Sequence, residues 1–158
     1  MNIKRFGILA ICLMTALTAN AGVKADAIYK KYKDVENCTA LTLSGPLMKL
    51  AMGSAAKQLP KGAKVSSINV IGFESEKFAD PGSMWEKLDC DLRKSMEMLT
   101  DTRKDGNRVK IYVEPQGDII TSFVMFVQDS HKNVFAVLCN GSMPKEEVSK
   151  MIEENTKK

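Results

Sequence analysis

Three apolar segments near the C-terminus decide the expected fold, and residues 108–140 read RVKIYVEPQGDIITSFVMFVQDSHKNVFAVLCN. These segments are rich in β-branched and aromatic residues, which favour strands; they comprise residues 108–114, 119–128 and 133–140. The two links between them are short and contain turn-forming residues, so hairpins can join the segments. The stretch therefore predicts an antiparallel meander of three strands.

Upstream of the meander, strand-like and helix-like patterns alternate. Apolar residues at helical spacing predict short helices at 26–35 and 46–57, and strands are expected at 38–43 and 65–74. A final helix is expected after Pro144, since proline is favoured in the first turn of a helix.

The longest helix is expected between Ser83 and Gly106. Ser83 and Glu86 have the spacing of a capping box, and basic residues followed by Gly106 are typical of a helix end. One apolar stripe runs along this segment: Trp85, Leu88, Leu92, Met96 and Leu99.

The order of elements after the N-terminal helix is therefore βαβαβββα. Short links favour antiparallel pairing, whereas helical connections favour parallel pairing of the earlier strands. We predict an α+β protein with a mixed five-stranded sheet and helices packed on it.

The N-terminus has the pattern of a secretory signal peptide. Lys4 and Arg5 precede an apolar run at 6–16, and Ala19-Asn20-Ala21 places small residues where a signal peptidase cleaves. Cys12 does not fit a lipoprotein signal, because the bulky Ile11 precedes it. We expect a signal peptide at 1–21, one α+β domain at 22–158, and a periplasmic or secreted protein.

The charge balance argues against several classes of partner. The whole chain has 23 basic and 19 acidic side chains, and cleavage after Ala21 would remove two basic ones. The lysines are scattered and no aromatic residues are interleaved with them, so nucleic acid is not an expected partner. No later apolar run is long enough to span a membrane after signal cleavage.

Catalytic and metal-binding patterns are absent from the sequence. His131 is the only histidine, it is expected in a turn, and no glycine-flanked serine stands between a strand and a helix. We interpret the acidic residues near the long helix as a solvated face: Glu86, Asp89, Asp91 and Glu97. We expect no cofactor, no metal and no identifiable catalytic residue.

Three cysteines follow the predicted signal peptide, and their odd number allows at most one internal disulfide. Cys90 lies off the apolar stripe of its helix, which predicts an exposed free thiol. If a bridge forms, we expect it between Cys38 and Cys139.

The expected meander also predicts a binding surface. Pairing Val113 with Ile120 and Phe126 with Phe135 would place Val109, Val124 and Cys139 on the face covered by helices. The opposite face would then carry an apolar patch formed by Tyr112, Phe123, Met125, Val127, Val134, Ala136 and Leu138. Either a helix, with 26–35 as the natural candidate, covers this patch, or it stays open for a partner.

The chain resembles a family of exported Gram-negative bacterial proteins known as domain of unknown function 4252. Patterns of apolar strands and turn glycines carry the resemblance, at residues 32–44, 47–48, 68–74, 106–114, 119–127 and 134–141 and in the helix after Pro144. The resemblance implies a periplasmic or outer-envelope setting and assigns no catalytic residue. It also implies an accessory role in envelope signalling, because members are encoded near envelope-responsive sigma factors and their anti-sigma partners.

Three hypotheses for function follow. The first is a non-enzymatic periplasmic binding or interaction module, whose partner is another envelope protein or a second copy of the chain. The alternatives are a hydrolytic or thiol-dependent periplasmic enzyme, and a self-associating structural component.

Overall fold

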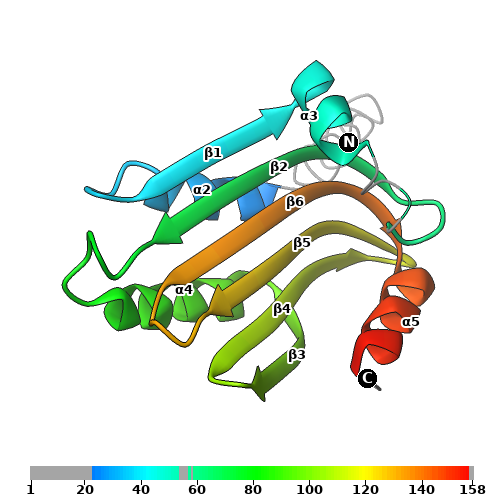
Figure 1. Ribbon diagram of the computed structural model, residues 1–158. Coiled ribbons are helices and arrows are strands. Elements are labelled where there is room, and N and C mark those ends of the chain that lie inside the picture. The colour runs from blue at the N-terminus through cyan, green and yellow to red at the C-terminus, as the bar shows by residue number, and fades with distance from the viewer. Residues whose placement is uncertain (1–22, 54–56, 58, 157–158) are drawn as a thin grey trace, which may run out of the picture.

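The computed structural model describes residues 23–53, 57 and 59–156, and in this part of the chain one six-stranded sheet carries four helices (Figure 1). The elements in chain order are α2 (Val23–Tyr32), β1 (Thr39–Ser44), α3 (Gly45–Met52), β2 (Lys64–Phe73), α4 (Pro81–Ser95), β3 (Glu97–Lys104), β4 (Asn107–Gln116), β5 (Ile119–Gln128), β6 (Val134–Pro144) and α5 (Lys145–Thr156). The predicted α+β class is confirmed. The predicted signal peptide lies outside the described residues.

The sheet has the strand order β1-β2-β6-β5-β4-β3, and every neighbouring pair is antiparallel. The prediction of a mixed five-stranded sheet was therefore wrong in strand number and in direction. Helix α3 follows the end of β1, where the chain turns back to form β2 beside it. Helix α4 carries the chain from β2 to the opposite edge of the sheet. Neither helix joins two parallel neighbours, as a βαβ crossover would.

The sixth strand occupies sequence that was predicted to be helical. Helix α4 ends at Ser95, and residues Glu97–Lys104 form the edge strand β3, which pairs with β4. Asp105 and Gly106 both have positive φ, at 54° and 79°, so they form the two-residue turn of a hairpin rather than a helix end. An Asp-Gly pair is favoured in such turns because both central positions need left-handed backbone.

Helix α4 also begins earlier than predicted. Its N-cap is Asp80, whose carboxylate accepts a hydrogen bond from the Ser83 amide at 3.2 Å. Pro81 follows in the first turn, where its missing N–H costs no hydrogen bond. The cap therefore uses Asp80 and Pro81 rather than a capping box at Ser83 and Glu86.

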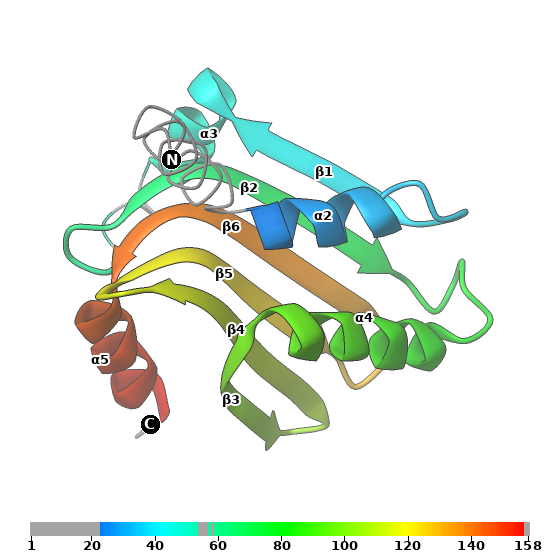
Figure 2. The same cartoon turned by 180° about the vertical axis from the view of Figure 1, so that it is seen from behind.

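Helices α2 and α4 cover one face of the sheet, and Figure 2 shows both in front of it. The main core lies between them and the sheet, and Trp85, Leu88 and Leu92 of α4 contribute to it. From α2 come Ala25, Ile28 and Tyr32, so this helix packs as the spacing of its apolar residues predicted. None of the helices in the described ranges is long and apolar enough to cross a membrane.

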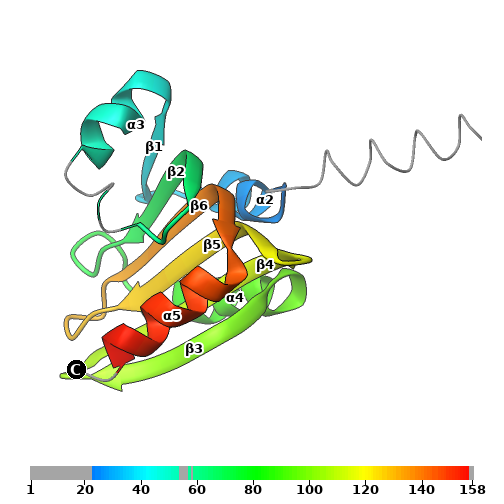
Figure 3. The ribbon, with the colours of Figure 1, turned by 90° about the vertical axis from the view of Figure 1, so that its right-hand side faces the viewer.

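Helices α3 and α5 lie toward the other face (Figure 3). They follow β1 and β6, which run in the same direction, so both helices stand at the same end of the sheet (Figure 1). Helix α5 covers a second, smaller core in which Val148 is fully buried with Val113, Ile120 and Met143. The two faces of the sheet are therefore covered very unequally.

The predicted register of the last three strands was wrong. The observed pairs are Val113–Phe123 and Val127–Phe135, instead of Val113–Ile120 and Phe126–Phe135. The β5–β6 connection begins after Gln128 and ends before Val134, so it holds an odd number of residues, with Lys132 in a left-handed conformation. A bulge at Glu114/Pro115 also interrupts the β4–β5 ladder. A shift of one residue moves each side chain to the opposite face of a sheet.

Candidate functional site

The face of the sheet opposite α2 and α4 carries a continuous apolar surface, which we call the open face. It consists of Leu41, Leu43, Ile68, Val70, Val109, Ile111, Phe123, Met125, Val127, Phe135, Val137 and Cys139. The strand pairing places Leu41, Val70, Val137, Met125 and Ile111 side by side in its central row. None of these twelve residues has an acidic or basic side chain other than the Cys139 thiol.

Much of the open face is accessible to solvent. Leu41 is 50% exposed and Met125 38% exposed, and the other members are partly buried. Helix α5 covers one end, where Phe123 and Ile111 pack against the core that contains Val148. Figure 1 looks onto this face, and none of the described helices crosses its central row.

The seven residues predicted to form one apolar patch lie on both faces of the sheet. Tyr112, Val134, Ala136 and Leu138 are almost completely buried under α2 and α4. Phe123, Met125 and Val127 belong to the open face instead. The register shift explains the division, because it exchanges the faces of β4 and β6 relative to β5. Val109 and Cys139, which were expected under the helices, lie on the open face for the same reason.

A buried ionic cluster attaches α4 to the sheet. The Lys110 ammonium is fully buried and donates a hydrogen bond to Asp89 Oδ1 at 2.8 Å. The Tyr112 hydroxyl donates to the same oxygen, and Arg93 pairs with Asp89 Oδ2 at 2.7 Å. Asp101 on β3 lies 3.9 Å from Lys110 Nζ. The interpretation of Asp89 as a solvated helix residue was therefore wrong.

The cluster determines the charge state of its members. Burial alone would raise the pKa of Asp89, but hydrogen bonds from Lys110 and Tyr112 and the charges of Lys110 and Arg93 outweigh it, so the pKa of Asp89 is lowered. Burial and the hydrogen bond to Asp89 raise the pKa of Tyr112 to about 12. At neutral pH Asp89 is therefore a carboxylate and Tyr112 a neutral phenol.

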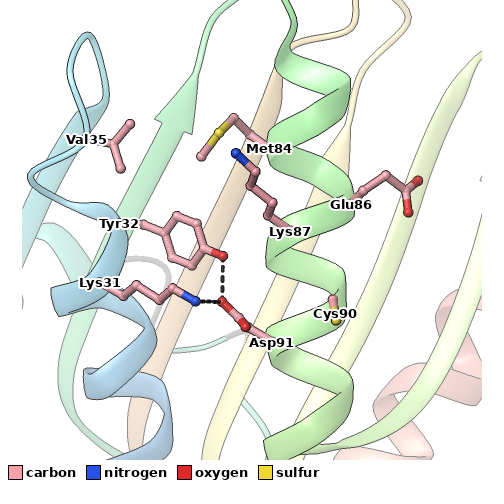
Figure 4. Close-up of a pocket in the computed structure, with 8 residues that line it drawn as sticks. All are labelled: Lys31, Tyr32, Val35, Met84, Glu86, Lys87, Cys90 and Asp91. Carbon is pink, nitrogen blue, oxygen red and sulfur yellow. Dashed lines mark hydrogen bonds and ion pairs between the residues drawn. The ribbon is translucent and has the colours of Figure 1, made fainter.

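A groove of about 510 Å³ separates α2 from α4 on the helical side (Figure 4). Tyr32 Oη and Lys31 Nζ of α2 both donate to Asp91 Oδ2 of α4 at 2.6 Å. Burial and this hydrogen bond raise the pKa of Tyr32 well above its usual value. The three side chains therefore form a bridge between the two helices. Val35 and Met84 line the apolar part of the groove.

The three cysteines of the described chain are free thiols. Cys90 is exposed on α4. Cys38 packs against the core under the helices, whereas Cys139 lies on the open face, so the structure contains no Cys38–Cys139 bridge. Burial raises the pKa of Cys139 to about 11, which keeps this thiol protonated at neutral pH.

The remaining candidate residues stay apart from one another. His131 is exposed in the β5–β6 turn, where its amide donates to Asp129 Oδ1 at 2.9 Å. Glu86 is exposed on α4, and Glu97 is exposed on β3 rather than on a helix. Within residues 23–53, 57 and 59–156, no cluster of histidine, cysteine and carboxylate side chains has the arrangement of a metal site.

The sequence did not predict two features, which are the buried Lys110–Asp89 pair and the open face. Lys110 and Asp89 resembled surface residues, and only their pairing in space makes their burial possible. The open face left a clearer signal, since residues 123–127 and 134–139 are apolar at consecutive positions and not only at alternate ones. Such runs are typical of strands that are buried on both faces.

Comparison with known proteins identifies the family of the chain. No curated protein and no solved structure shows significant similarity to it. Residues 32–151, from the end of α2 into α5, match the family described as domain of unknown function DUF4252. This match includes the whole sheet, the ionic cluster of Asp89 and the open face, and it agrees with the resemblance seen in the sequence. The chain therefore belongs to the DUF4252 family.

Proposed function

We propose that this protein is a non-enzymatic interaction module of the periplasm that docks an apolar partner on its open face. The observation that supports this proposal is an uncharged apolar surface of five adjacent strands, of which the described helices cover only the end beneath α5. The sequence resemblance implies that members of the family work in the bacterial envelope. On that basis, we propose an accessory role in envelope signalling for this protein.

The size of the open face argues that it has a partner. Strands about 4.8 Å apart and same-face residues about 6.8 Å apart along a strand make this surface roughly 500 Å² in footprint. Apolar patches of this size on soluble proteins are often functional. At about 25 cal/mol per Å², its burial would contribute on the order of 10 kcal/mol before the costs of association. A docked partner would therefore gain substantially from this contact.

The alternative of a hydrolytic or thiol-dependent enzyme receives less support. A general acid or base needs a carboxyl group that is free to exchange a proton with a substrate. Asp89 and Asp91 are instead held in ion pairs with lysine and arginine side chains, which lower the pKa of both. Among the described residues, Cys90 is exposed and no hydrogen bond joins its thiol to a side chain that could act as a base.

The docking proposal can be tested by site-specific photo-crosslinking in the native host. A photoreactive residue replaces Met125 on the open face, and a matched variant carries it at Met98. Met98 is 48% exposed and pairs with Tyr112, so it lies on the other face of the sheet. We expect an adduct from position 125 and none from position 98. Absence of an adduct at 125, or equal adducts at both positions, would contradict the proposal.

The proposed location has a separate test. We expect the exported protein to begin at Gly22, because Ala19-Asn20-Ala21 fits a signal peptidase site. Intact mass spectrometry of the protein from a periplasmic extract measures this directly. A chain that retains Met1, or that carries acyl groups on Cys12, would show that the export prediction is wrong.

A further inference from the structure

We infer that the occupant of the open face is a second copy of this chain, and that two copies pack sheet against sheet to form a sandwich. This inference rests on the proposed function and names its partner. It is carried by the area of the open face, by its lack of charge, and by the position of α3 and α5 at one end of it.

The area of the surface suits a second sheet better than a narrower ligand. Its footprint of roughly 500 Å² spans five strands, whereas a single extended peptide would cover a strip about 5 Å wide. Helix α3 projects on the same side (Figure 3), and its side chains Leu47 and Leu50 are 64% and 80% exposed. The footprint of the open face is more than half of the roughly 800 Å² per partner of a stable protein interface, so we expect a weak dimer.

The chemistry of the surface is self-complementary. An isologous contact brings the same surface of two copies together, so any charge within it would meet a like charge near the axis. The open face has no lysine, arginine, aspartate or glutamate in its three rows. The edge strand β3 differs sharply, because Glu97, Asp101, Arg103 and Lys104 are exposed along it. Charges of this kind oppose pairing at an edge.

The helices at one end select the orientation of the two copies. A two-fold axis parallel to the strands would bring α3 and α5 of both copies together at the same end. A two-fold axis perpendicular to the strands, in the plane between the sheets, places each pair of helices beyond the far end of the partner's sheet. The sheets would then lie about 10 Å apart, with their strands within about 30° of antiparallel. The axis would then run along the central row, so this row would face its own copy, with Val137 of the middle strand at the centre of the contact.

Sedimentation velocity of the purified mature protein tests this arrangement. We expect the wild type to have twice the monomer mass at about 100 µM, the range in which weak dimers are populated. Met125→Asp should be monomeric and should melt close to the temperature at which the wild type melts when it is diluted to a monomer, because the Met125 side chain is already partly exposed in one copy. Met98→Asp introduces the same charge on the other face and should remain dimeric.

A second readout does not depend on tolerance of a charge. In a Cys90→Ser background, Val137→Cys should form covalent dimers with a bismaleimide whose reach is about 10 Å, the spacing of packed sheets. The background protein alone and Met98→Cys in that background should form no covalent dimer, and protonation of the partly buried Cys139 thiol limits its reaction.

Two outcomes would overturn the inference. A monomeric wild type without Val137→Cys crosslinks would exclude the sandwich, and an adduct from position 125 to a different protein would then leave the proposed docking function standing. A dimer that survives Met125→Asp and resists crosslinking at Val137→Cys would place self-association on another surface, such as the uncharged edge strand β1.

Discussion

Replacement of Asp89 by alanine is expected to lower the free energy of unfolding by about 3–5 kcal/mol. Among the described residues, the substitution leaves the fully buried Lys110 ammonium with Asp101, at 3.9 Å, as its one remaining counter-charge. It also removes the acceptor of the Tyr112 hydroxyl and the ion-pair partner of Arg93. Urea denaturation followed by Trp85 fluorescence measures the loss, since Trp85 is the only tryptophan.

The matched control removes both charges instead of one. In the double variant Asp89→Leu with Lys110→Met, no charge remains buried without a partner, so we expect it to recover most of the stability lost in Asp89→Ala. Equal destabilisation of the single and double variants would show that packing, and not the unpaired ammonium, determines the loss.

Acid provides a second readout of the same cluster. The pKa of Asp89 is lower in the folded protein than in the unfolded chain, where it is about 3.9. The contribution of Asp89 is therefore present above about pH 4 and is lost as pH falls through the folded value. The double variant should lose less stability than the wild type over this range.

Replacement of Trp85 by alanine should cost about 3–5 kcal/mol, as expected for truncation of a large core aromatic. Trp85 is 2% exposed and stacks on Phe126, with ring centroids 3.9 Å apart and an interplanar angle of 13°. Arg108 and Lys110 lie over its ring at 5.2 and 5.8 Å. Thermal unfolding followed by circular dichroism measures the effect, because the variant lacks the fluorophore.

Phenylalanine at position 85 is the matched control. The buried indole Nε1 has no hydrogen-bond partner in the part of the chain that the structure describes, so Trp85→Phe loses no such bond there. This variant also keeps an aromatic ring against Phe126, and we expect less than half of the alanine effect. A loss as large as that of alanine would mean that the full indole volume, rather than stacking, is required.

The local patterns of the sequence predicted most of the individual elements. Strand β5 was predicted at its observed bounds, and the first and last helices were expected near their observed positions. The largest error concerns residues 97–104, where Met96 and Leu99 extended the apolar stripe of α4. Thr100 and Thr102 before Asp105-Gly106 contained the signal of a hairpin, and the structure uses it. The helical spacing of Met96 and Leu99 covered only one extra turn. It was weaker evidence for a helix than Asp105-Gly106 was for a hairpin turn.

The sequence by itself determined the class of the protein, because its strand and helix patterns depend on neighbours within a few residues. Only the tertiary structure decided the register, because an odd connection and a bulge each shift strand pairing. It also decided which apolar face α2 and α4 cover, since alternation cannot choose between two faces when both are apolar. The tertiary structure also decided that Lys110 is buried. A lysine in a strand predicts a solvated face until a carboxylate from a distant helix, here Asp89, offsets the cost of its burial.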